Sequence, residues 1–177
     1  GLAAQHLTAV LSVAELCRAE LSGATLGSET LSFRPTVPPR AGDYLFDVAA
    51  AREGGSAGAA TLVLQTVALV ALFASGVSRF CIRGGTHVPW SPPYDYIAHV
   101  WRPLLARMGI SLEVELAQFG FLPVGQGEIT ARVSGLGSQT SAHLKPVEII
   151  ARGPLRSVSG RAFAANLPSH IAQRMAA

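Results

Sequence analysis

The sequence predicts an α/β (α+β) protein built from repeated strand-helix units, with the helices packed on one side of each β-sheet. Segments with helical spacing of apolar residues alternate with short segments typical of strands. The order helix, turn, two strands occurs twice, over residues 5–34 and 94–133. In addition, 49% of the 177 residues are hydrophobic and 14% are charged, which indicates a folded core and argues against a disordered chain.

The N-terminal part begins with an amphipathic helix. Apolar residues recur at helical spacing over residues 5–20. A strand pair turning at Gly27 and Ser28 is expected next, and a proline-rich loop separates it from a third strand; the three strands are residues 24–26, 30–33 and 44–48. A flexible stretch is expected over residues 51–58.

The most apolar run of the chain covers residues 59–74, where only Thr61, Gln65 and Thr66 are polar. A transmembrane helix is the rival interpretation. The run is shorter than the ~20 residues that a span needs, and it has an amide near its middle. We therefore expect a buried core helix, followed by a strand at residues 78–83.

The second half repeats the pattern. A helix is expected over residues 94–108, with a kink or break at Pro103 because proline lacks a backbone N–H. The remaining elements are four strands and a final helix that opens at Pro168: strands 110–116, 128–133, 146–151 and 156–160, and helix 168–177.

Charge and cysteine content set limits on function. The net charge of +3 is compatible with a polyanionic partner. Cys17 and Cys81 lie in apolar contexts without further ligands nearby, so neither a zinc site nor a disulfide framework is indicated and both thiols are expected to be buried and reduced. The first residues lack the features of a secretory signal, and a cytoplasmic location is expected.

Four segments carry a family resemblance. They are residues 1–10 (GLAAQHLTAV), 56–66 (SAGAATLVLQT), 84–96 (GGTHVPWSPPYDY) and 120–128 (GFLPVGQGE). In this order and spacing they resemble segments of the RNA 3′-terminal phosphate cyclases over nearly the whole chain. On this resemblance, residues 1–160 are the central part of the catalytic domain, with the end of one repeat, one whole repeat and the start of a third. Residues 161–177 start a further helix.

The resemblance implies an activity and its partners. Cyclases of this family are ligases that use ATP, with Mg²⁺ or Mn²⁺, to convert the 3′-terminal phosphate of RNA to a 2′,3′-cyclic phosphate through a covalent nucleotidyl-histidine. RNA 3′ ends and ATP are therefore the expected partners, and no association with a membrane is expected. An oligomer is possible, and the oligomeric state stays open.

Gln65 is the foremost candidate for ATP binding, because the family's corresponding Gln contacts ATP. An unsatisfied amide inside an apolar helix would cost about 1–3 kcal/mol, so a partner is required. The alternative is a core Gln that bonds to a neighbouring backbone group. Gln5 and His6 are expected near the RNA phosphate, at the start of a helix whose N–H groups favour anions. The alternative is that His6 caps the helix or packs.

The resemblance implies an adenine pocket near Pro92 and Asp95, where a proline edge can form the flat wall against which an adenine packs. A proline pair and an acidic first turn of a helix explain the same residues without a ligand. The turn at residues 120–127 lacks the Lys-Ser/Thr of a phosphate-binding loop, so a hairpin connection is expected there.

The chain departs from the family pattern at several places. Gln126 interrupts a triple Gly, Val124 stands where Arg is common, His87 replaces an Asp, and residues 52–55 look inserted. The family's N-terminal Gly-rich segment and C-terminal nucleophilic His are absent, and no pattern marks His87, His99, His143 or His170 as that nucleophile. We expect no catalytic residue and no metal ligand in this chain, and no activity of this fragment alone.

Two other functions stay open. One is a non-catalytic, cyclase-like RNA-binding protein of ribosome assembly. The other is a protein resembling the enolpyruvyl transferases, which share the repeated architecture and bind small anions.

Overall fold

The computed structural model describes residues 1–51, 57–137 and 144–176, in two compact units, Gly1–Val147 and Glu148–Ala177. Residues 52–55, which look inserted, and His143 lie outside the described residues, as does most of the stretch expected to be flexible.

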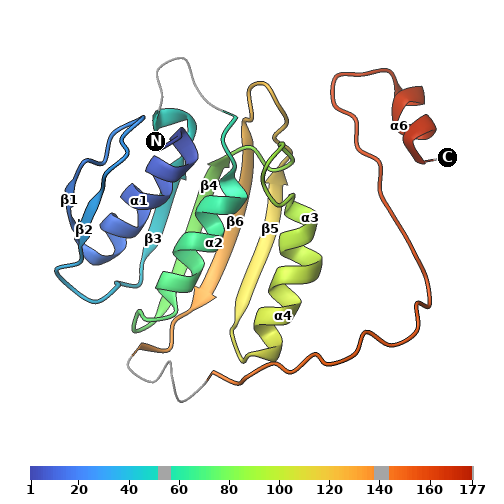
Figure 1. The fold of residues 1–177 in the computed structure, drawn as a ribbon. Helices are drawn as coiled ribbons and strands as arrows, with labels where there is room; N and C mark the ends of the chain where they lie inside the picture. The colour runs from blue at the N-terminus through green and yellow to red at the C-terminus, as the bar shows by residue number, and fades with distance from the viewer. Residues whose placement is uncertain (52–56, 138–143, 177) are drawn as a thin grey trace. The chain divides into compact units, whose positions relative to one another are not determined.

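The first unit is built on a four-stranded sheet in the order β3-β4-β6-β5 (Figure 1). The strands are β3 (Asp43–Asp47), β4 (Val77–Gly84), β6 (Gly127–Ser134) and β5 (Leu112–Gln118). β3 runs parallel to β4, and the other neighbours are antiparallel. This matches the strands predicted at residues 44–48, 78–83, 110–116 and 128–133.

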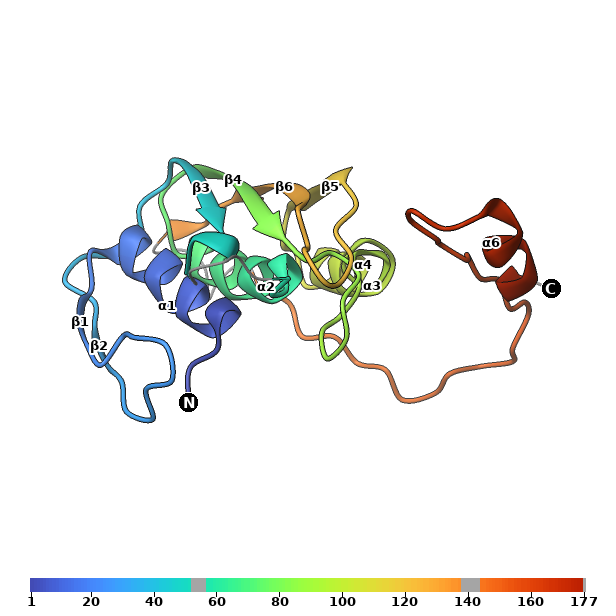
Figure 2. The same ribbon diagram turned by 90° about the horizontal axis from the view of Figure 1, so that it is seen from above.

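The helices of this unit all lie on one side of the sheet, which Figure 2 shows from above. They are α1 (Ala4–Cys17), α2 (Ala60–Ala71), and the succession α3 (Tyr94–Tyr96), η2 (Ile97–Trp101) and α4 (Arg102–Arg107). A single 3-10 turn, η1 (Ala49–Ala51), follows β3. The predicted fold class, with helices on one side of the sheet, is confirmed.

Helix α2 forms the centre of the core, as predicted for the apolar run. Val63, Leu64 and Val67 are fully buried, and they belong to one cluster with Phe80 and Ile129 of the sheet. Burial of each such side chain stabilises the fold by about 1.5–3 kcal/mol. No helix in the described part of the chain is long and apolar enough to cross a membrane.

The disturbance that Pro103 predicts is a π-helical turn, η2, directly before α4. The N–H of Arg102 donates to the carbonyl of Ile97, five residues back. Proline has no N–H to donate and its ring crowds the preceding turn, so a widened turn accommodates it.

A separate two-stranded ribbon follows α1. Its antiparallel strands are β1 (Glu20–Ser22) and β2 (Ser32–Arg34). The strand predicted at residues 24–26 is wrong, because these residues form the connection, in which Gly23 and Gly27 have positive φ angles. The helix also ends earlier than predicted, since Arg18 adopts the left-handed conformation that terminates α1.

The second unit contains one helix, α6 (Ser169–Ala176), close to the helix predicted from Pro168. The strands predicted at residues 146–151 and 156–160 are wrong. The segment has apolar residues typical of strands, but Ile150 and Val158 are 87% and 84% exposed and no described strand pairs with it. Without a partner the backbone groups of a strand remain unpaired, and apolar alternation alone does not form one.

Candidate functional site

A groove between α1 and α2 brings together three of the predicted site residues. Gln5 and His6 come from the first turn of α1, and Gln65 comes from the middle of α2. The groove has a volume of about 500 Å³, and its remaining lining residues are Ala9, Leu62, Thr66 and Leu69. Two sequence segments almost sixty residues apart thus supply one surface.

Gln5 and His6 also make bonds that hold the two helix starts. The Nδ1 atom of His6 accepts a hydrogen bond from the N–H of Ala3 at 3.3 Å. The Oε1 atom of Gln5 accepts one from the N–H of Ala59, the residue that caps α2, also at 3.3 Å. The capping role considered for His6 is therefore present, while its phosphate-binding role stays a prediction.

Gln65 differs from the expected buried amide. Its side chain is only partly buried, and among the described residues it makes no hydrogen bond. The cost of an unsatisfied buried amide consequently does not apply, because water can reach the group. What remains is an amide on the groove wall that can bond to a ligand.

Pro92 and Asp95 do not line this groove. Pro92 precedes Pro93, the cap residue of α3, and Asp95 lies in the first turn of that helix, as in the ligand-free alternative. The Asp95 carboxylate lies 2.9 Å from Nε2 of His87 and 3.9 Å from Nε2 of His99.

His87 joins three segments of the chain. Its Nδ1 lies 2.9 Å from the hydroxyl of Thr86, and that hydroxyl accepts the N–H of Gly120 at 2.9 Å. The rings of Phe119 and Phe121 lie 5.2 and 5.6 Å from the imidazole. No pattern in the sequence predicts this role of His87, although the position stands out because the family has an Asp there.

A second hollow, of about 680 Å³, adjoins the N-terminal end of α1. Its walls are residues 2–5, Leu26, residues 57–58, residues 88–90 and residues 122–123. Gln5 lines both this hollow and the groove. Trp90, in the wall, is 98% exposed, and nothing in the sequence marked it as a site residue.

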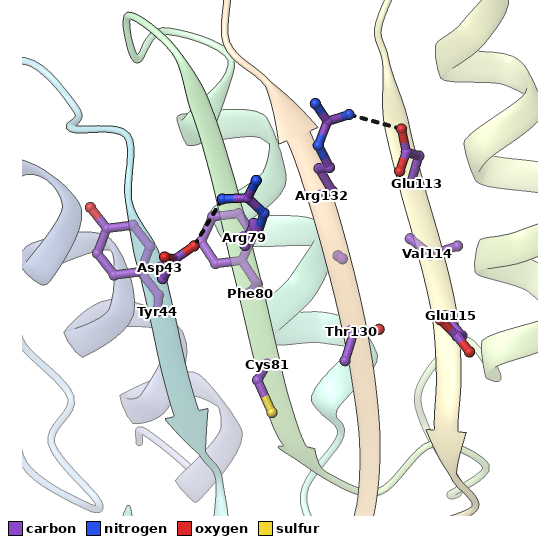
Figure 3. A pocket seen from close by; sticks show the side chains of 11 residues that line it. Asp43, Tyr44, Arg79, Phe80, Cys81, Glu113, Val114, Glu115, Thr130 and Arg132 are labelled. Carbon is purple, nitrogen blue, oxygen red and sulfur yellow. Dashed lines mark hydrogen bonds and ion pairs between the residues drawn. The ribbon is translucent and has the colours of Figure 1, made fainter.

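The sheet face opposite the helices carries a third hollow, of about 470 Å³ (Figure 3). Two ion pairs cross it, Arg79 with Asp43 at 3.3 Å and Arg132 with Glu113 at 2.9 Å. No predicted site residue lines it.

The two cysteines are both free, as expected. Cys17 is buried as predicted, whereas Cys81 is only partly buried, because it lines the hollow on the open sheet face. Burial raises the pKa of both thiols, which favours the protonated form.

No group of three or more His, Cys, Asp and Glu side chains within the described residues could hold a metal ion.

Comparison with known proteins identifies the family. The model of the RNA 3′-terminal phosphate cyclase family matches residues 1–176. The chain belongs to this family. The predicted family is confirmed.

Three cyclases illustrate the similarity. The RNA 3′-terminal phosphate cyclase of Methylococcus capsulatus is 57% identical over 177 residues, which are 100% of this chain and 48% of that protein. Those of Gloeothece citriformis and Pseudomonas fluorescens are 49% and 44% identical, over 99% and 98% of this chain and 49% and 47% of their own lengths. The chain thus spans about half the length of the curated cyclases that it matches.

Proposed function

We propose that the protein carrying this chain converts the 3′-terminal phosphate of RNA to a 2′,3′-cyclic phosphate at the expense of ATP. Family membership supports the reaction class. The observation that carries the proposal for this part of the molecule is the groove, where Gln5 and His6 of α1 lie with Gln65 of α2.

The groove offers hydrogen-bond donors to a phosphate ligand. Among the described residues that line it none is acidic, so no carboxylate repels a phosphate. Amide N–H₂ groups of Gln5 and Gln65 can donate to phosphate oxygens. Nδ1 of His6 accepts the N–H of Ala3, so the ring N–H lies on Nε2 and can donate as well. We assign Gln65 to ATP, and Gln5 and His6 to the RNA phosphate.

The proposed reaction has three steps. A histidine nitrogen attacks the α-phosphorus of ATP and releases pyrophosphate. An oxygen of the RNA 3′-phosphate then takes the AMP group from the histidine. Finally the neighbouring 2′-hydroxyl attacks the RNA phosphorus, loses its proton and releases AMP. We assign no histidine of this chain to the first step, and we derive no step through a metal ion.

The first experiment is incubation with ATP labelled at the α-phosphate, in the presence of Mg²⁺ or Mn²⁺, followed by denaturing electrophoresis. The complete gene product should form a covalent AMP adduct and should cyclise a 3′-phosphorylated oligoribonucleotide. The 177-residue chain alone should do neither. A complete product that binds RNA but forms no adduct would contradict the proposal and favour the non-catalytic alternative.

The role of Gln65 can be tested by Gln65→Ala in the complete gene product. We expect kcat/KM for adduct formation to fall about 10- to 100-fold, since a hydrogen bond to a charged group is worth about 1.5–3 kcal/mol. Thermal stability should be unchanged, because the Gln65 amide makes no hydrogen bond to a described residue. Gln173→Ala, on the exposed face of α6, is the matched control and should alter neither quantity. Equal rates for both variants would remove Gln65 from the site.

A further inference from the structure

Trp90 is an exposed aromatic residue beside a hollow. Its side chain is 98% exposed, although a large aromatic ring gains free energy by packing. The surrounding wall is largely apolar, with Leu26, Val88, Pro89, Leu122 and Pro123. Leu26 and Leu122 are themselves exposed, so the ring belongs to an apolar patch and is not a single surface residue.

The backbone of Trp90 is strained. Its φ angle is +64°, which is unusual for a bulky side chain. Pro89 stands before it in the turn, and the hydroxyl of Ser91 donates to the carbonyl of Val88 at 3.0 Å. Proline followed by a positive φ is typical of a type II turn, where glycine is favoured at the position that Trp90 occupies. Strain of this kind is concentrated at functional sites.

The hollow and the proposed binding groove are adjacent, because Gln5 lines both. If the terminal phosphate of an RNA lies in the groove, the hollow on the other side of Gln5 is an adjoining surface for the last nucleotides. Among the described lining residues of the hollow none carries a charge, so the wall neither attracts nor repels the phosphates. Proteins recognise unpaired bases of RNA by stacking them on aromatic side chains.

We propose that the Trp90 ring is a stacking platform for the base of one of the last three nucleotides of the RNA substrate. This inference rests on the proposed function, since it takes the RNA phosphate to lie in the groove. The apolar walls around the ring then serve any of the four bases, because every base has a flat apolar face.

The test is RNA binding by the complete gene product, measured as fluorescence anisotropy of a labelled, 3′-phosphorylated oligoribonucleotide. Trp90→Ala and Trp90→Gly should each weaken binding about tenfold, which is about 1.4 kcal/mol. Trp90→Phe keeps a ring and should weaken binding much less. Glycine also suits the positive φ angle, so Trp90→Gly removes the ring without adding strain.

Phe73→Ala is the matched control. Phe73 is also aromatic and 53% exposed, but it lines neither the groove nor the hollow around Trp90. Its replacement should leave the RNA affinity unchanged. A loss of affinity as large as that of Trp90→Ala would overturn the platform, because it would show that any exposed aromatic residue contributes.

Oligoribonucleotides that lack one base distinguish stacking from other causes. Each of the last three bases is removed in turn and the affinity for the wild-type protein is measured. At one of the three positions, the loss of affinity should equal the loss caused by Trp90→Ala. The combination of both changes should cost no more than either one. Full additivity at all three positions would overturn the platform.

Two further outcomes separate the two proposals. If Trp90→Ala and Trp90→Gly bind RNA as tightly as the wild type, or weaken only ATP binding, the platform is overturned and the cyclase function stands. If the wild-type protein binds no 3′-phosphorylated RNA, both proposals fall.

Discussion

Gly120 lies where the β5–β6 connection passes close to the backbone of Gly127, the first residue of β6, and of Gly84, the last residue of β4. A Cβ atom at this position would lie 2.5 Å from the nitrogen of Gly127 and 2.5 Å from the carbonyl oxygen of Gly84. Backbone atoms cannot move aside as a side-chain tip can. We therefore expect Gly120→Ala to lower the free energy of unfolding by about 1–3 kcal/mol, measured by urea denaturation.

Gly160→Ala is the control for this prediction, because a Cβ atom there meets nothing within 4 Å. Its effect on unfolding should be close to zero. If the two alanine variants unfold at the same urea concentration, the close approach at Gly120 does not limit stability.

Single residues also show what a sequence can reveal about a site. Gln5, His6 and Gln65 could be named because they stand in motifs shared with the family, and the structure places all three on one groove. Trp90 could not be named, since neither its positive φ angle nor its exposure is visible in the order of residues. The contact of Asp95 with His87 could not be predicted from the sequence, because it depends on how the loop between these two residues folds back.

Ion pairs join the strands of the sheet on their open face. One of these pairs makes the stability of the fold depend on pH. Arg83 of β4 donates from Nε to the carboxylate of Glu128 on β6, at 2.9 Å. This hydrogen bond lowers the pKa of Glu128, and partial burial opposes it. Folding thus favours the ionised carboxylate. The stabilisation is present above the ordinary Glu pKa, about 4.3, and is lost as the pH falls through the lower pKa of the folded state.

We therefore expect Arg83→Gln to raise the pKa of Glu128 toward its ordinary value, measured by NMR titration of the side-chain carboxyl. The variant should also lose less stability than the wild type when the pH is lowered from 7 to about 3. Arg79→Gln is the control. Arg79 lies on the same strand but pairs with Asp43, so its replacement should leave the pKa of Glu128 unchanged. An unchanged pKa in Arg83→Gln would rule out this bond as its cause.

Helices and strands were predictable where their own side chains determine their burial. The apolar run of α2 and the alternation along β4 and β6 specify which face meets the core, and these elements lie close to their predicted positions. The prediction of strands at residues 146–151 and 156–160 was wrong, because it rested on side-chain pattern alone. A strand depends on a neighbour that supplies hydrogen bonds, and the order of residues within the segment carries no information on whether one is present.

The division of the chain into two units predicts how it responds to shortening. Helix α6 buries no residue, and every buried residue of the core lies between Ala4 and Val133. Removal of residues 148–177 should therefore change the thermal midpoint of residues 1–147 by less than about 4 °C, the shift that corresponds to about 1 kcal/mol in a domain of this size. Circular dichroism would measure this thermal midpoint.

A chain shortened further, to residues 1–126, is the contrasting case, because it lacks β6, which lies between β4 and β5. That chain should show no cooperative unfolding. If the chain of residues 1–147 behaved in the same way, the second unit would be needed for the fold of the first.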